Sequence, residues 1–541
     1  MFNRREFMKA AASAGSLGMT STVNALASRH QASNGFFGVH PFIENHPEAV
    51  FIMRTGVEDI NDSAAKLSAG LEFGRSVIVP RTQENGGVPL TSLIPVKPNL
   101  TCRGRWDSLW TEEKTKTVVT DAHFVEGIIN AVMELGVEGD QFYIREVNCP
   151  EDFEIDGFGN PSAEDPGGVA GRVGAHLDDM TLEVGALDEE LIVWSEVPDP
   201  VYFIRVPHLW PINAPGSWLL NVAKFKAHGM GVTMTVKNLQ GCVVHNYQRF
   251  ANGYRYLDMR REDRTDQPLE TIQNNYNKHK DVIPRWDRPG TSWNSGIGME
   301  TWATMTLDNH GALKPGLNVV EGIVARDGNG FARGPGPDGL SQEFLTNVIM
   351  FGMNPFHIDN IGHWLGGHEP GNFGLFHIAA ERNFADTMNP REIPVYEWFP
   401  DGTAQLTPLD SFERTPLMTY YLQRDYDGQN EDYYHLCDEP FEYPATRVHE
   451  QVKPSAIVLH QNFPNPFNPF TAIEYSIPRA GNTRLEIFNV EGQLVDVLVD
   501  GYIIPGSHMA VWNTGNHASG TYFYRLQFES FSEMKKMVLL K

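Results

Sequence analysis

Hydrophobic positions change their spacing twice between residues 94 and 148. Residues 94–100 and 141–148 are short apolar runs of the kind that form buried strands. Between them, residues 122–136 place apolar side chains three and four positions apart, which is the period of a helix. Strand, helix and strand at this spacing predict a βαβ unit in a parallel sheet. We therefore expect functional side chains at the carboxyl ends of the strands.

The second half of this region continues the pattern. An apolar stretch at residues 344–366 is interrupted by a turn at residues 352–355, and a helix-like pattern begins at Asp359. Other strand candidates are residues 201–207, 218–223 and 317–325. The predicted fold class is α/β, with a mixed or mostly parallel sheet and flanking helices over residues 36–440.

The C-terminal part has a different pattern. Runs of β-branched and aromatic residues follow one another about every ten residues, with Gly, Asn and Pro between them, which predicts a small antiparallel β-sandwich over residues 457–541. Residues 442–456 have little periodicity and are expected to be a linker. The runs are residues 483–490, 494–499, 508–513, 520–528 and 534–541.

Composition limits the classes of partner. The chain has 541 residues, more than one core usually supports, and a net charge of -25 that argues against nucleic acid or an anionic membrane as partner. The cysteines form no CxxC pair, which excludes a local zinc knuckle or ferredoxin-type cluster but leaves one or two disulfides open. They are Cys102, Cys149, Cys242 and Cys437.

The N-terminus has the features of an export signal. Residues 3–9 (NRREFMK) precede a weakly apolar run that ends in the small-residue site at residues 25–27. This stretch, residues 1–27, resembles a twin-arginine signal, which implies a protein folded around a cofactor before export. An amphipathic first helix or a Sec signal are the alternatives. No other segment reaches about 18 apolar residues, so no transmembrane segment is expected in the mature chain.

Residues 460–541 resemble the type A C-terminal sorting domain of the type IX secretion system. The resemblance implies that the secretion machinery is a partner and that the protein reaches the surface or the medium of a Gram-negative bacterium. An ordinary carbohydrate-binding or adhesion sandwich is the alternative. The matching residues are Asn465-Pro466-Phe467-Asn468-Pro469, Asn489-Val490-Glu491-Gly492-Gln493, Gly520-Thr521-Tyr522-Phe523-Tyr524, and Lys535-Lys536 with the terminal Lys541.

The strongest candidate for chemistry is residues 223–242, AKFKAHGMGVTMTVKNLQGC. Strand alternation would place Lys224, Lys226 and His228 on one face. Several buried lysines without an acidic neighbour in sequence are costly unless something anionic meets them. The predicted partner is a bound phosphate or carboxylate, and remote carboxylates of the chain itself are the alternative, with Glu321 and Asp359 as candidates.

An ordered set of motifs over roughly residues 90–385 resembles the domain of unknown function 362. Glu321 stands where the resemblance leads us to expect an aspartate, and the ferredoxin-like cysteine motifs of some relatives are missing. The resemblance therefore implies a fold rather than a reaction. The motifs are Lys97-Pro98-Asn99, Thr120-Asp121, Lys224-x-Lys226-x-His228-Gly229, Lys237-Asn238-Leu239, Glu321-Gly322-Ile323, Gly328-Asn329-Gly330 and Asn354-Pro355 before Asp359.

These residues support two hypotheses of function. One is an exported enzyme, in which His228 acts as general acid/base with Lys226 in a Lys/His-lined cleft for an anionic small molecule or cofactor. A cofactor-dependent oxidoreductase is one form of it, with the cofactor unknown. The other is a non-catalytic ligand-binding protein at the cell surface. Predicted ligand-binding residues are Lys97, Asn99, Lys224, Thr233, Lys237, Asn238, Asn329 and Asp359.

Three further sequence patterns are weaker indications of a binding site. Direct metal ligation by His228 with Asp359 or Glu321 is disfavoured because the nearby lysines repel a cation, so we predict no metal site. The glycine-rich residues 326–339 lack the Lys-Ser/Thr of a P-loop. The acidic residues 151–156 are expected to be a solvated turn rather than a calcium loop.

Overall fold

The chain forms two compact units, Met1–Glu442 and Tyr443–Lys541, in a computed structural model. Residues 35–443 and 456–540 are described, apart from internal gaps. The expected signal (1–27) and most of the expected linker (442–456) therefore lie outside the described residues. The gaps are residues 84–85, 101–115, 148–149, 181–190, 204, 230, 245–266, 291–294, 330–333, 337–338, 420–436, 463–464, 468–469, 480, 504–505 and 516.

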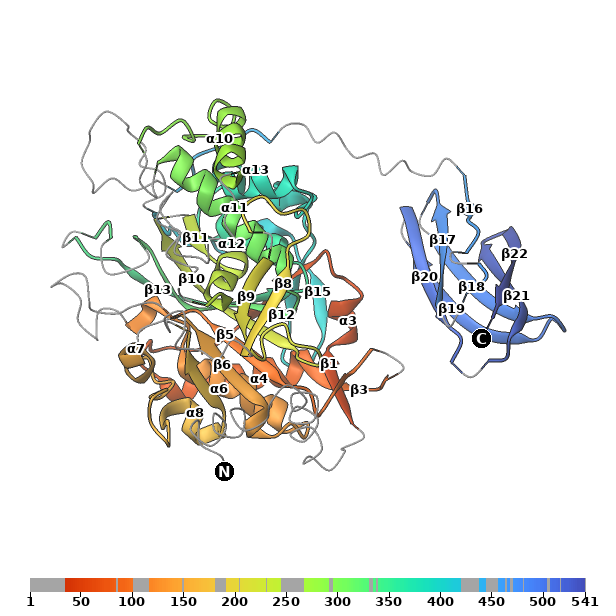
Figure 1. The fold of residues 1–541 in the computed structure, drawn as a ribbon, viewed down its shortest axis with the longest axis horizontal. Helices are drawn as coiled ribbons and strands as arrows, with labels where there is room; N and C mark the ends of the chain where they lie inside the picture. Colours follow the sequence, from red (N-terminus) through yellow and green to blue (C-terminus); the bar gives the residue numbers. More distant parts are fainter. Residues whose placement is uncertain are drawn as a thin grey trace. The chain divides into compact units, whose positions relative to one another are not determined.

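A ten-stranded mixed sheet runs through the larger unit (Figure 1). Neighbours are parallel from β12 through to β7, whereas β13 is antiparallel to both of its neighbours. The predicted α/β fold with a mixed sheet is thus confirmed. In spatial order the strands are β15 (Ala404–Leu406), β14 (Val395–Trp398), β2 (Val50–Arg54), β13 (Glu343–Gly352), β12 (Pro315–Arg326), β10 (Leu219–His228), β5 (Ile94–Pro98), β6 (Phe142–Glu146) and β7 (His176–Asp179), with β11 (Gly231–Thr233) beside the end of β10.

Helices cover both faces of this sheet (Figure 1). Alternation along β10 explains the two layers: Leu220 and Val222 belong to the core under the first helix group, and Ala223 and Phe225 pack with α12. The first group is α4 (Ser63–Val77), α6 (Ala122–Met133), α7 (Pro150–Ile155) and α8 (Gly168–Val173). The second is α9 (Thr235–Asn238), α10 (Gln267–His279), α11 (Gly296–Ala312), α12 (Pro355–Leu365) and α13 (Gly374–Glu381).

Helices α4 and α6 pack closely against each other. A Cβ on Gly70 would lie 2.1 Å from the carbonyl oxygen of Phe124, and one on Gly127 would lie 2.3 Å from that of Leu67. Only glycine lets the two backbones approach this closely. Asp121 is the N-cap of α6, since its side chain accepts hydrogen bonds from the first turn of the helix.

Smaller elements complete the larger unit. They are helix α3 (Pro41–Glu44), a sheet of β1 (Phe36–Val39), β3 (Ile78–Arg81) and β4 (Val88–Pro89), and the antiparallel pair β8 (Ile192–Glu196) and β9 (Arg205–Leu209). No helix in the described ranges is long and apolar enough to cross a membrane.

Three local predictions were wrong. The strand expected at residues 201–207 begins only at Arg205. The acidic residues 151–156 lie mostly in helix α7, which starts at Pro150, a residue whose fixed φ suits a first helical position. Helix α12 starts four residues before Asp359, because the Asn354 side chain caps it and Pro355 opens it.

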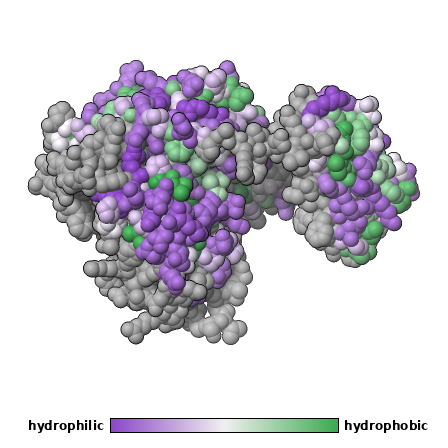
Figure 2. Space-filling model, turned by 90° about the horizontal axis from the view of Figure 1, so that it is seen from above, coloured by the Kyte–Doolittle hydropathy of each residue, from purple (hydrophilic) through white to green (hydrophobic). Residues whose placement is uncertain are grey.

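The smaller unit consists of two antiparallel sheets around one core, which confirms the predicted sandwich. Strands β16 and β17 were not predicted. One sheet contains β16 (Val458–Leu459), β17 (Phe470–Ile477) and β20 (Gly506–Asn513). The other contains β19 (Leu494–Ile503), β18 (Gly481–Asn489), β21 (Gly520–Phe528) and β22 (Phe531–Leu539). Figure 2 shows hydrophobic areas among hydrophilic ones on its surface; the exposed large apolar residues include Val490, Leu494, Met534 and Leu540.

Candidate functional site

The carboxyl ends of β5, β10 and β12 carry most of the predicted site residues. Because the three strands are parallel neighbours, their ends meet at one edge of the sheet. Lys97 is aligned with Asn221, Lys224 with Glu321, and Lys226 with Arg326. The predicted strand 218–223 continues to His228, so the Lys-x-Lys-x-His segment is itself strand.

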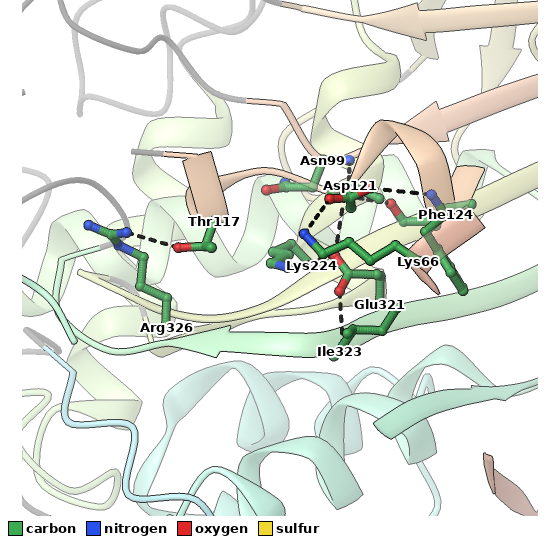
Figure 3. A network of polar contacts seen from close by, with 12 residues as sticks. Lys66, Asn99, Thr117, Asp121, Phe124, Lys224, Glu321, Ile323 and Arg326 are labelled. Atoms are coloured by element: carbon green, nitrogen blue, oxygen red, sulfur yellow. Dashed lines mark hydrogen bonds and ion pairs between the residues drawn. The ribbon is translucent and has the colours of Figure 1, made fainter. Parts of the chain in front are cut away.

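Lys224 belongs to a buried charge network (Figure 3). Its Nζ lies 2.6 Å from Glu321 Oε2, and both side chains are at most 2% exposed. Glu321 also accepts hydrogen bonds from the backbone N–H of Ile323 (2.9 Å) and of Asp121 (3.3 Å). The remote-carboxylate alternative therefore holds for Lys224.

Asp121 connects this network to helix α4. Its Oδ2 lies 2.7 Å from Lys66 Nζ, while Oδ1 caps α6 through the N–H groups of His123 and Phe124. Burial raises the pKa of Asp121, but the hydrogen bond with His123 and the charge of Lys66 hold the pKa well below its ordinary value. Asp121 is therefore ionised and stabilises both the helix and Lys66.

Lys97 occupies a second network. Its Nζ contacts Glu146 Oε2 at 2.6 Å, Asn238 Oδ1 at 3.1 Å and the Pro98 carbonyl at 2.6 Å. Burial raises the pKa of Glu146, and the charge of Lys97 opposes that shift. A Cβ on Gly241 would lie 2.0 Å from Glu146 Oε1 and 2.3 Å from Lys97 Cε, so glycine alone fits against this pair.

Side-chain amides join the strand ends to helix α9. Asn99 Nδ2 donates to Asn238 Oδ1 (3.0 Å), and Asn238 Nδ2 donates to Asn221 Oδ1 (2.8 Å). Asn221 Nδ2 donates in turn to Asn318 Oδ1 at 2.9 Å. Lys97, Asn99 and Asn238, predicted as ligand-binding residues, thus lie together and are hydrogen-bonded to one another.

Lys226, His228 and Lys237 lie where basic side chains act on one another. Burial holds the pKa of Lys226 well below that of an ordinary lysine, and the charges of Lys237, Lys224 and Arg326 lower the pKa further. Glu146 opposes this shift, but its effect is weaker. Burial and then both lysines also lower the pKa of His228. Lys226 is 2% exposed, whereas Lys237 and His228 are partly exposed.

The remaining predicted residues lie around this edge. Thr233 pairs with Lys226 through the backbone, and the Asn329 carbonyl accepts from the Gly229 N–H at 3.3 Å. Within the described ranges Asp359 is paired with no lysine, and it accepts instead from the backbone N–H groups of Thr235 (2.8 Å) and Val236 (3.1 Å). Burial raises the pKa of Asp359 to about 7.

Sequence reasoning missed three residues of this edge: Glu146, Arg326 and Asn221. Glu146 lies near the end of the predicted strand 141–148, and Arg326 directly follows the predicted strand 317–325. Arg326 Nη1 lies 3.0 Å from Glu343 Oε1 and 2.9 Å from Thr117 Oγ1. Glu146 and Arg326 had no visible partner in the local sequence and Asn221 lay inside a predicted strand, so the sequence pattern did not identify them as members of the site.

Metal and thiol chemistry find little support among the described residues. In that part of the chain no three His, Cys, Asp or Glu side chains come together in a way that could hold a metal ion. Cys242 and Cys437 are free thiols, and burial raises the pKa of each to about 12. Neither is therefore a ready nucleophile at neutral pH.

Together, these features define an α/β protein with a cationic cluster at the edge of a parallel sheet, joined in sequence to an antiparallel sorting-type sandwich. Residues 94–363 match the family model described as Domain of unknown function (DUF362). Residues 461–540 match the Secretion system C-terminal sorting domain. The chain thus carries a DUF362 domain followed by a sorting domain, as both resemblances implied. No curated protein matches it.

The sorting domain has a consequence for location. A domain of this class indicates export to the cell surface or the medium and implies the secretion machinery as a partner.

Proposed function

We propose that the larger unit binds a small anionic molecule at the edge formed by β5, β10 and β12. The observation that carries this proposal is the convergence of Lys97, Lys224, Lys226, Lys237 and Arg326 on one strand edge. Glu146 and Glu321 each contact one lysine, and like charges still dominate around Lys226. A phosphate or carboxylate would relieve that repulsion and accept several charge-assisted hydrogen bonds.

Within this proposal the partly exposed side chains contact the ligand, and the buried ones contribute to the positive electrostatic potential around it. His228 and Lys237 are partly exposed, and Lys226 is buried. The lowered pKa of His228 leaves its imidazole neutral, as a general base requires. This arrangement favours an enzyme over a non-catalytic binder, which would not need a neutral base beside its cations.

Calorimetric titration of the full chain with inorganic phosphate, sulfate and malonate tests the proposal. We expect saturable binding with proton uptake near pH 7, because an anion raises the pKa of nearby lysines. Lys226→Met should weaken binding by at least about tenfold, or 1.4 kcal/mol. The exposed Lys314→Met is the matched control and should bind as the unmodified chain does. No saturable binding of any of the three anions, or equal affinity in both variants, would refute the site.

Catalysis and redox chemistry need a separate measurement. An oxidoreductase would hold a redox cofactor through the same cations, and the absorption spectrum and metal content of the purified chain test for one. A colourless protein that returns every bound ligand chemically unchanged, with and without His228→Ala, would favour the non-catalytic alternative.

The export route is also a proposal. We propose that residues 1–27 direct twin-arginine export, that residues 36–440 form the functional domain and that residues 442–456 link it to the sorting domain. Arg4→Lys together with Arg5→Lys should block export and leave the precursor inside the cell. Unchanged export of this double variant would instead support a Sec signal.

A further inference from the structure

One histidine joins three helices of the larger unit. Helix α11 packs against both α10 and α13 (Figure 1). His279, the last residue of α10, has a side chain that is only 10% exposed. Its Nδ1 lies 2.9 Å from Glu300 Oε2 and 3.1 Å from Glu300 Oε1, on α11. Its Nε2 lies 2.6 Å from Glu381 Oε2, on α13. The imidazole ring therefore bridges two carboxylates that come from different helices.

These two contacts require a protonated ring. An ionised carboxylate only accepts hydrogen bonds, and a neutral imidazole has a single N–H to donate. Because both nitrogens of His279 face carboxylate oxygens, both can donate only when the ring is an imidazolium. Burial lowers the pKa of His279, but the hydrogen bonds and charges of Glu300 and then of Glu381 outweigh burial and raise the pKa above that of an ordinary histidine.

The two carboxylates differ in what they lose when the ring becomes neutral. Glu300 is 0% exposed, and its Oε2 also accepts from Trp286 Nε1 at 2.7 Å. The Glu381 side chain is 52% exposed, so water can take the place of the histidine there. A buried carboxylate that loses a donor is more costly than a hydrated one. The N–H that remains on neutral His279 should therefore be the one on Nδ1, facing Glu300.

Other titratable groups around His279 keep their charge state in the same pH range. Burial lowers the pKa of His377, on α13, and the charge of His279 lowers it further against the hydrogen bond to the Gly371 carbonyl. Burial, followed by the charges of Asp287, Asp281 and Glu300, raises the pKa of Tyr276, on α10. Both side chains are thus neutral between about pH 7 and pH 9. Charged neighbours along the chain are Lys278, Lys280, Asp281 and Arg382.

We propose that His279 is a pH-sensitive link: as an imidazolium it ties α13 to α10 and α11, and on losing its Nε2 proton to water it releases Glu381 and keeps Glu300. A histidine whose pKa is raised on folding stabilises the fold fully below about pH 6.5, and this contribution is lost as the pH rises through the folded pKa. The link does not depend on the anion site. Because the sorting domain indicates export, the pH that acts on it is that of the cell surface or the medium.

Hydrogen exchange of the full chain, measured by mass spectrometry at pH 6 and pH 9 and corrected for the intrinsic exchange rate at each pH, tests the link. Protection of residues 374–381 should fall roughly two- to fivefold at the higher pH, the range expected for a partly exposed ion pair. Glu381→Gln should remove this fall, because a glutamine can accept from a protonated Nε2 and donate to a neutral one. The exposed Glu270→Gln, on α10, is the matched control and should keep the fall.

Three results would overturn the link. The first is equal protection of residues 374–381 at both pH values, and the second is a fall that persists in Glu381→Gln. The third is a fall that His377→Gln removes and Glu381→Gln does not, which would assign the titration to His377. Every variant retains His279 and the buried Glu300, so none of them leaves a buried charge without its partner.

Discussion

Lys224 and Lys226 lie two residues apart on one strand and are almost equally buried, yet their surroundings are opposite. Lys224 meets Glu321 at 2.6 Å, in a network that extends to Asp121 and Lys66 (Figure 3). The charges that act on Lys226 are mainly those of other cations, with Glu146 as the weaker opposing group. The first environment stabilises the fold, and the second is the one that the proposed function assigns to an incoming anion. Burial by itself therefore does not reveal which charges surround a lysine.

Replacing Lys224 or Lys226 by methionine should give the largest difference in the free energy of unfolding. Lys224→Met leaves Glu321, 1% exposed, without its counter-charge and should cost about 3–5 kcal/mol of unfolding free energy. Lys226→Met removes a charge that its neighbours repel and should cost at most about 1 kcal/mol. Urea unfolding of the full chain measures both, and the smaller unit contributes equally to each. Equal losses would show that Lys226 depends on a counter-charge as Lys224 does.

Gly241→Ala should come next in size. Its methyl group would overlap the Lys97–Glu146 pair, and overpacking of this kind costs about 1–3 kcal/mol. Anion affinity should fall as well, since Lys97 must move. Gly56→Ala is the matched control, because a Cβ there meets no atom within 4 Å. Unfolding free energies that are the same for both variants would mean that the Lys97–Glu146 pair can move away from the added methyl group at little cost.

The pH dependence of the free energy of unfolding tests the environment of Lys226 and its neighbour Lys237. The pKa of Lys237 is about 7 in the folded chain and about 10.4 when unfolded, so the unfolded chain binds more protons between these values. Below pH 7 the loss of unfolding free energy caused by Lys237 is constant. Above pH 7 the free energy of unfolding rises by up to about 1.4 kcal/mol per pH unit. Lys237→Met should flatten the rise measured from pH 7 to 9, and Lys314→Met should not. A rise that persists unchanged in Lys237→Met would assign it to other groups.

Glu321→Asp should have the smallest effect. The aspartate keeps the charge that Lys224 needs, but its carboxylate withdraws by one methylene and can no longer reach both Lys224 and the Ile323 N–H. The loss of one such hydrogen bond costs about 1 kcal/mol. Urea unfolding should thus place Glu321→Asp between the unmodified chain and Lys224→Met. A loss as large as that of Lys224→Met would show that the reach of the glutamate, and not its charge alone, holds the lysine.

Local sequence determined the elements of this protein. The helical period after Asp121, the apolar runs around residues 94–100 and 141–148, and the spaced strands of the sorting domain depend on neighbouring residues, so they were predictable. Lys97 and Asn99 were likewise predicted at the end of a strand, but their contacts with Asn238, 141 and 139 positions away, depend on the fold.

Only the tertiary structure decided which charges meet. Glu321 is 97 positions from Lys224 along the chain, and Glu146 is 49 from Lys97. The first pair exists because β10 lies beside β12, and the second because β5 lies beside β6. The same topology assigned Asp359 to helix α9 and away from the lysines. Strand order and register are set by the packing of the whole core, which local patterns do not encode. The sequence by itself therefore specified the cationic residues, and the fold decided which of them contact a buried carboxylate, as Lys97 and Lys224 do.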